Sequence, residues 1–134
     1  MGMILLDTNI VSYLLKGDTR AKSYEPHLHE QQLAISFMTV AELFQWAAVR
    51  NWGSDRVKKL EQTLLETYTI LSFDINTCRL WGEVRAECRS EGRPISPQDA
   101  WIAATALQHN LPLVTHNPTD YEPLVDLELI TAKK

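Results

Sequence analysis

The chain has few cysteines and no apolar run long enough to cross a bilayer. Its only cysteines are Cys78 and Cys88, which stand ten positions apart in a stretch with helical character. They therefore lie on different faces of one helix and cannot form a disulfide within it. Free thiols are typical of a reducing compartment, so we expect a cytoplasmic protein without a membrane segment. No cysteine and histidine spacing is suited to zinc.

The sequence also lacks an excess of positive charge, because its formal net charge is −4. A protein that held nucleic acid by charge alone would be basic. Any contact with nucleic acid must then rely on a metal ion and on local basic patches, for which solvated helix faces are the alternative interpretation. The candidate patches are Arg50, Arg56, Lys58 and Lys59, and Arg79, Arg85, Arg89 and Arg93.

What is present indicates a folded α/β protein. The 134 residues are 45% hydrophobic, which fits a single domain over 1–134 with a real core. Short apolar segments predict strands at 3–6, 33–36, 69–72, 112–115 and 127–130. Helices are predicted between them at 8–16, 19–32, 39–51, 54–66, 74–90 and 96–110. This alternation is typical of a parallel sheet, where ligands bind beyond the carboxyl ends of the strands.

Acidic residues stand where such a sheet would bring them together. Asp7 directly follows the first strand, and Glu42, Asp99 and Asp120 stand near the beginnings of later helices or turns. Gathered at one edge, these carboxylates would repel one another unless a cation lay between them. A hard divalent ion such as Mg²⁺ prefers oxygen ligands. The sequence therefore predicts a metal-dependent site that acts on phosphate esters.

Each acid also has a structural interpretation. Asp7 could simply cap the helix at 8–16. Glu42 is three residues after Thr39, which is the spacing of a capping box, and its helix is apolar nearly all round. Asp99 has the same spacing from Ser96, but it begins the apolar face of its helix and should point inward. That face consists of Ile102, Ala103, Ala106 and Leu107.

The fourth position is open between Asn117 and Asp120, because Asn117 could be the cap of a short turn with Asp120 at its third position. His116 could be taken for a general base, although a histidine beside acidic residues is more often incidental, and metal-activated water needs none.

Four blocks, taken in order, resemble the PIN domain family and, within it, the VapC-type ribonuclease toxins of toxin–antitoxin modules. The blocks are Leu5-Leu6-Asp7-Thr8-Asn9, Ala41-Glu42-Leu43, Asp99-Ala100-Trp101-Ile102-Ala103-Ala104-Thr105-Ala106 and Leu113-Val114-Thr115-His116-Asn117-Pro118-Thr119-Asp120-Tyr121. The resemblance covers essentially the whole chain. It implies a PIN-like three-layer α/β/α fold with a five-stranded parallel sheet. It also implies an endoribonuclease that depends on Mg²⁺ or Mn²⁺ and cuts RNA.

The resemblance also assigns roles to individual residues. Asp7, Glu42 and Asp99 match the three acids that hold the metal, and Asn117 and Asp120 match a fourth, less uniform position. An asparagine at this position would weaken a second metal site. Hydrogen bonds to the ligands are expected from Thr8, Asn9 and Thr115. One departure is Tyr121, where relatives usually have phenylalanine.

The implied partners are a small cognate antitoxin and a second copy of the chain in a homodimer. Apolar residues such as Leu28, Phe44, Trp46 and Trp52 could form such surfaces or could be core. The main rival is a non-catalytic PIN-like interaction module, which would not need to hold repelling carboxylates together. A receiver domain is disfavoured because it needs two acids after its first strand and a lysine after its last. A phosphatase with an aspartate nucleophile is disfavoured by Asn9.

Overall fold

A five-stranded parallel sheet, with strand order β3-β2-β1-β4-β5, forms the centre of the computed structural model, which describes residues 2–133. The strands are β1 (Met3–Leu6), β2 (Gln32–Ser36), β3 (Thr69–Leu71), β4 (Leu113–Val114) and β5 (Leu129–Ile130). The helices are α1 (Thr8–Lys16), η1 (Thr19–Tyr24), α2 (Glu25–Leu28), α3 (Phe37–Val49), α4 (Ser54–Thr67), α5 (Ile75–Ser90), α6 (Pro97–His109) and η2 (Pro118–Tyr121). The predicted fold class is confirmed.

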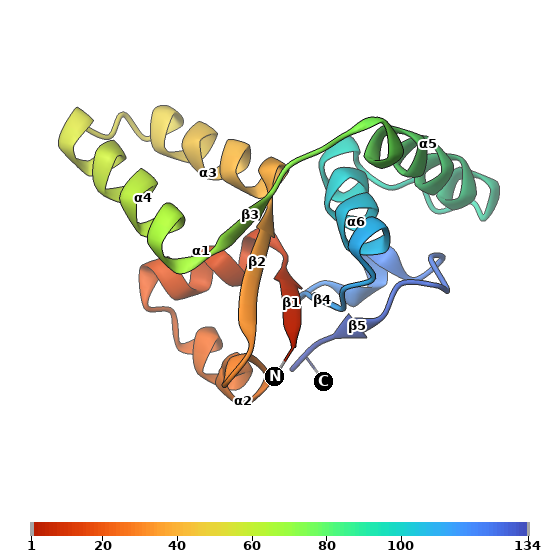
Figure 1. The fold of residues 1–134 in the computed structure, drawn as a ribbon, viewed down its shortest axis with the longest axis horizontal. Helices are drawn as coiled ribbons and strands as arrows, with labels where there is room; N and C mark the ends of the chain where they lie inside the picture. The colour runs from red at the N-terminus through yellow and green to blue at the C-terminus, as the bar shows by residue number, and fades with distance from the viewer. Residues whose placement is uncertain (1, 134) are drawn as a thin grey trace.

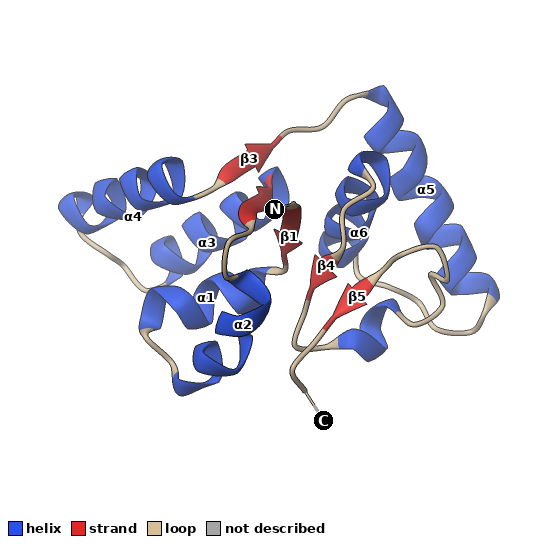
Figure 2. Cartoon of the chain, turned by 60° about the horizontal axis from the view of Figure 1, so that its bottom comes forward, coloured by secondary structure: helices blue, strands red, loops and turns tan. Residues whose placement is uncertain are grey.

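Helices cover both faces of this sheet, which gives three layers. In Figures 1 and 2, α1 to α4 lie on one side of the strands and α5 and α6 lie on the other. Side chains alternate between two separate cores, because successive residues of a strand point to opposite faces. Ile4 and Leu6 of β1 join the core beneath α1, α3 and α4, whereas Leu5 joins the core beneath α5 and α6. The strands are therefore buried on both faces, as their apolar sequences predict.

The carboxyl ends of the central strands lie at one edge of the sheet. β1 pairs in parallel with β2 and with β4, and Leu6 stands opposite Val114. The chain leaves β1 into α1, β2 into α3 and β4 towards η2. The segments that carry the predicted acids therefore begin at this edge, and α6 brings Asp99 next to Tyr121 of η2.

The helix at 39–51 begins earlier than predicted. Its cap is Ser36, whose hydroxyl accepts a hydrogen bond from the Met38 N–H at 3.0 Å. Thr39 is instead fully buried in the first turn, so the predicted capping box between Thr39 and Glu42 is wrong. Ser36 and Thr39 can both cap a helix, and they stand three positions apart. Ser36 is the cap because β2 ends at this residue and the helix follows directly.

The predicted helix over 19–32 is shorter and interrupted. It consists of η1 followed by the single turn of α2, and residue 32 already belongs to β2. Pro26 stands in the first turn of α2, where its missing N–H costs nothing. Within residues 2–133, none of the helices is long and apolar enough to span a membrane.

Candidate functional site

Asp7 is the most deeply buried acid of the site, with 5% of its surface exposed. It ends β1 and caps α1, where its Oδ1 accepts a hydrogen bond from the Thr8 N–H at 2.8 Å. Its Oδ2 accepts from the Thr115 hydroxyl at 2.7 Å and from the Tyr121 hydroxyl at 3.2 Å. The cap interpretation is therefore correct but incomplete, because the second oxygen faces groups from distant segments.

Glu42 is connected to Asp7 through Thr8. The Thr8 hydroxyl donates to Glu42 Oε1 at 2.7 Å and lies 2.9 Å from the Thr39 hydroxyl. Since a hydroxyl has one proton, Thr39 donates to Thr8 and Thr8 donates to Glu42. This chain of hydroxyls fixes the half-buried glutamate beside the end of β1.

Asp99 reaches the same edge from the first turn of α6. Ser96 caps this helix by accepting from the Asp99 N–H at 3.1 Å, and Pro97 occupies the first helical position. The Asp99 Oδ1 accepts from the Tyr121 hydroxyl at 3.3 Å. The same hydroxyl therefore lies between Asp7 and Asp99, and its single proton is shared between the two carboxylates.

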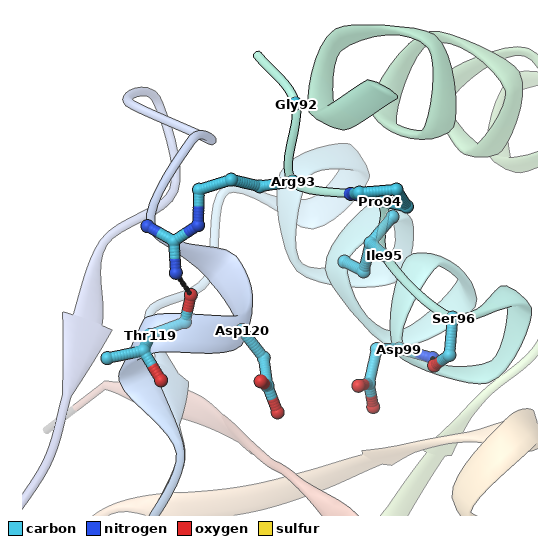
Figure 3. A pocket seen from close by; sticks show the side chains of 8 residues that line it. All are labelled: Gly92, Arg93, Pro94, Ile95, Ser96, Asp99, Thr119 and Asp120. Atoms are coloured by element: carbon cyan, nitrogen blue, oxygen red, sulfur yellow. Dashed lines mark hydrogen bonds between the residues drawn. The ribbon is translucent and has the colours of Figure 1, made fainter. Parts of the chain in front are cut away.

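Asp120 and Asn117, the two candidates for the fourth position, lie in different places in the structure. Asp120 is exposed on η2 and lines a cleft of about 440 Å³ together with Asp99. Figure 3 shows the two carboxylates pointing to the same side of this cleft. Asn117 precedes η2 without a side-chain cap, and its backbone N–H donates to the Thr115 hydroxyl at 3.0 Å. The geometry therefore groups Asp120 with the other acids, whereas Asn117 acts on Asp7 through Thr115.

Arg93 borders the cleft opposite the acids. Its guanidinium donates to the Thr119 carbonyl at 2.8 Å (Figure 3). It also donates to the Glu122 carboxylate at 2.6 Å, and the two contacts connect the loop before α6 to η2 and the residue after it. The sequence placed Arg93 in a basic patch but gave no sign of this bridge.

The pKa values of the central acids are raised by burial and by one another. Burial raises the pKa of Asp7 to about 6, and the Asp99 charge adds to the shift. The pKa of Asp99 is raised by burial and then by Asp120, and that of Glu42 by burial and then by Asp99. The opposing contributions come from hydroxyl and backbone donors, with no lysine or arginine among them. The site therefore holds excess negative charge.

These residues fit a divalent cation. Uncompensated carboxylates favour a hard positive ion, and Mg²⁺ is commonly held by only one or two of them while it keeps several waters. No three acidic, thiol or imidazole side chains within residues 2–133 converge tightly enough to surround an ion. Asp7 and Asp99, which share a single bridging hydroxyl, are the pair that matches the two-carboxylate arrangement.

Asn9 and His116 were the other polar residues that the sequence placed near the carboxylates. Asn9 is exposed and lines a neighbouring groove with Glu42 and Lys16. His116 points its Nδ1 at the Tyr24 hydroxyl, 2.6 Å away, and burial lowers the pKa of its imidazole. This geometry favours the interpretation of His116 as incidental to the carboxylates.

The Tyr121 hydroxyl is the feature that sequence reasoning missed. The ring is fully buried in the core beneath α6. Burial and then the two carboxylates raise the pKa of Tyr121 far above its ordinary range, so the hydroxyl keeps its proton and donates. The departure from phenylalanine was the available signal, because a buried tyrosine hydroxyl usually finds a partner.

The chain is similar to known proteins over most of its length. The model of the PIN domain family matches residues 4–121. Ribonuclease VapC1 of Haemophilus influenzae strain R2866 is 32% identical over 126 residues, covering 92% of this chain and 93% of the relative. Toxin FitB of Neisseria gonorrhoeae is 33% identical over 122 residues, covering 86% and 88%. The solved structure of VapBC-1 from nontypeable H. influenzae superposes with a TM-score of 0.83 at 31% identity and covers all of both chains. The predicted resemblance is confirmed: the chain belongs to the PIN domain family and within it is similar to the VapC-type proteins.

Proposed function

We propose that this protein is an endoribonuclease that depends on Mg²⁺ or Mn²⁺ and acts as the toxin of a toxin–antitoxin module. The observation that carries the proposal is the gathering of Asp7, Glu42, Asp99 and Asp120 at the carboxyl edge of the sheet, where three of them have raised pKa values. Relatives with the names ribonuclease VapC1 and toxin FitB support both parts of the proposal.

Asp7 and Asp99 would hold the ion. A divalent ion in this place would supply activation of water and neutralisation of charge on a phosphate. Thr8, Thr115 and Tyr121 hold the two carboxylates through the hydrogen bonds described above. These donors favour the ionised carboxylates that an ion requires.

Glu42 and Asp120 would act around the ion rather than as its main ligands. Thr8 holds Glu42 by Oε1, so Oε2 is available to accept a proton from water and orient it towards the phosphorus. Addition of that water and cleavage of the bond to the 3′ oxygen would give a 3′-hydroxyl and a 5′-phosphate. Asp120 lies at the exposed rim of the cleft, where it adds negative charge next to Asp99.

One of the residues that line the cleft carries a positive charge. Arg93 lines the same cleft as Asp99 and Asp120, and arginine is well suited to phosphate oxygens. The net charge of −4 keeps non-specific attraction to RNA weak. Recognition would then depend on the ion, on Arg93 and on the shape of the cleft.

An antitoxin would bind to the helical layer that contains α1, α3 and α4. Trp46 and Trp52 pack on the core there with their rings 5.1 Å apart. Between them and α1 lies a groove of about 410 Å³, which Lys16 and Arg56 border. Apolar walls with basic rims suit an amphipathic acidic segment. Phe44 and Leu28 are partly buried against the same core and add little free surface.

Cleavage of a panel of cellular RNAs by the purified protein, in Mg²⁺ or Mn²⁺ and in EDTA, tests the enzymatic part. We expect cutting only with the metal. Absence of both cutting and metal binding would favour the non-catalytic interaction module. Light scattering after size-exclusion chromatography tests the proposed homodimer, and a monomer at tens of micromolar would contradict it.

A further inference from the structure

We propose that Tyr121 is a positioning residue of the metal site, and that its hydroxyl fixes which oxygens of Asp7 and Asp99 are free to take the ion. The hydroxyl lies 3.2 Å from Asp7 Oδ2 and 3.3 Å from Asp99 Oδ1. Among the hydrogen bonds of residues 2–133, it is the only group in contact with both carboxylates. This inference rests on the proposed function.

The contacts divide the carboxylate oxygens into two kinds. Asp7 Oδ2 accepts from the Thr115 hydroxyl, and it shares the single proton of the Tyr121 hydroxyl with Asp99 Oδ1. Asp7 Oδ1 accepts only from the Thr8 N–H, which leaves it one lone pair. At Asp99, Tyr121 engages Oδ1 and leaves Oδ2 available. Each carboxylate therefore offers one oxygen to an ion while the other is held by the protein.

The hydroxyl has a fixed location because its ring and its backbone are both held. The ring is fully buried in the core beneath α6. Beside the ring, the Arg93 guanidinium donates to the backbone carbonyl of Thr119 and to the side-chain carboxylate of Glu122, which lie on either side of Tyr121 in the sequence. A buried ring between two anchored positions cannot follow a carboxylate that rotates, so the carboxylates must adapt to the hydroxyl.

A phenylalanine at this place would fill the core equally well but would remove the one group that links the two carboxylates, leaving Asp7 to Thr8 and Thr115 and freeing Asp99 Oδ1. Without this link, the negative charge that Asp7 and Asp120 place near Asp99 would favour rotation of its carboxylate towards water or towards other donors. Groups that orient metal ligands typically change metal affinity by about 10-fold to 100-fold when they are removed. The contact distances here are long for hydroxyl donors, so the lower end of that range applies.

The test is binding of Mn²⁺ alone, measured by electron paramagnetic resonance of the free ion, to the unaltered protein and to Tyr121→Phe. We expect the dissociation constant to rise about tenfold in the variant. The matched control is Tyr24→Phe, which also removes a buried tyrosine hydroxyl, one that contacts His116 rather than the acids. The control should bind Mn²⁺ like the unaltered protein.

A second readout separates positioning from general stability. The Mn²⁺ concentration that gives half-maximal RNA cleavage should rise with the dissociation constant, while the rate at saturating Mn²⁺ stays within a few-fold. Melting temperatures in EDTA check that the variants fold. Equal or tighter Mn²⁺ binding by Tyr121→Phe would overturn this inference alone, whereas failure of the unaltered protein to bind Mn²⁺ would overturn it together with the proposed function.

Discussion

Replacing Asp7 by asparagine should stabilise the metal-free protein at neutral pH while removing its activity. Asp7 is 5% exposed and carries its charge beside Asp99 without a positive partner among its contacts. Asparagine has nearly the same shape but no charge. Its Oδ1 can still accept from the Thr8 N–H, and the Thr115 and Tyr121 hydroxyls can rotate to accept from its amide.

The magnitude follows from the pKa of Asp7, which rises from 3.8 to about 6. Each unit corresponds to about 1.4 kcal/mol, so the ionised carboxylate lowers the free energy of unfolding at pH 7 by about 3 kcal/mol. Between these two pKa values the folded state binds more protons than the unfolded state. The stability associated with Asp7 is therefore fully present below pH 3.8 and is lost as the pH rises through about 6. Imperfect hydrogen bonding of the amide reduces the expected gain for Asp7→Asn to about 2 kcal/mol.

Urea unfolding in EDTA, followed by the fluorescence of the four tryptophans, measures this difference. Asp7→Asn should be the more stable protein at pH 7, and the difference should nearly vanish at pH 4. Saturating Mn²⁺ should reverse the order, because an ion at 100 times its dissociation constant adds about 2.7 kcal/mol to the protein that binds it. If Asp7→Asn were less stable than the unaltered protein in EDTA at pH 7, the buried charge of Asp7 would not be destabilising the metal-free protein.

Two further changes test the surroundings of the site. Thr115→Val removes the strongest donor to Asp7, which should raise its pKa further and move the acidic limb of the pH–rate profile to higher pH; an unmoved limb would contradict the role of Thr115. Arg93→Ala should raise the KM for RNA several-fold and change stability by less than about 0.5 kcal/mol, since its ion pair is exposed. The control Arg79→Ala removes a similarly exposed arginine pair on α5 and should leave the KM unchanged; equal effects of the two changes would assign the result to net charge rather than to the cleft.

The strand-end and helix-start positions made Asp7 and Asp99 predictable. Asp7 follows an apolar strand directly, and Asp99 begins the apolar face of α6, so both were expected to point inward near the sheet edge; Asp7 is buried there and Asp99 partly so. The contacts of Glu42 were harder to predict, because α3 is apolar nearly all round and the spacing of Thr39 and Glu42 is that of a capping box. The actual cap is Ser36, and Glu42 contacts Thr8, 34 positions away in the sequence.

The remaining features depend on contacts that sequence patterns do not contain. The Tyr121 hydroxyl contacts Asp7, which is 114 positions away in the sequence, and Arg93 contacts Glu122, which is 29 positions away. A periodic pattern predicts which face of an element is buried, but not which distant hydroxyl meets a given carboxylate. The choice between Asn117 and Asp120 could not be made from the sequence either, since both stand near one turn; in the fold Asp120 lines the cleft, and the contact of Asn117 with Thr115 is through its backbone N–H.

The most direct test of the central claim is RNA cleavage by Asp99→Asn compared with Asp126→Asn, each in Mn²⁺ and in EDTA. Asp126 is an exposed aspartate outside the carboxylate site, so the two variants lose the same charge in different places. The account predicts that Asp126→Asn cuts like the unaltered protein in Mn²⁺, that Asp99→Asn does not cut although it is folded, and that EDTA abolishes all cutting. Full cleavage by folded Asp99→Asn, or cleavage that persists in EDTA, would contradict the account.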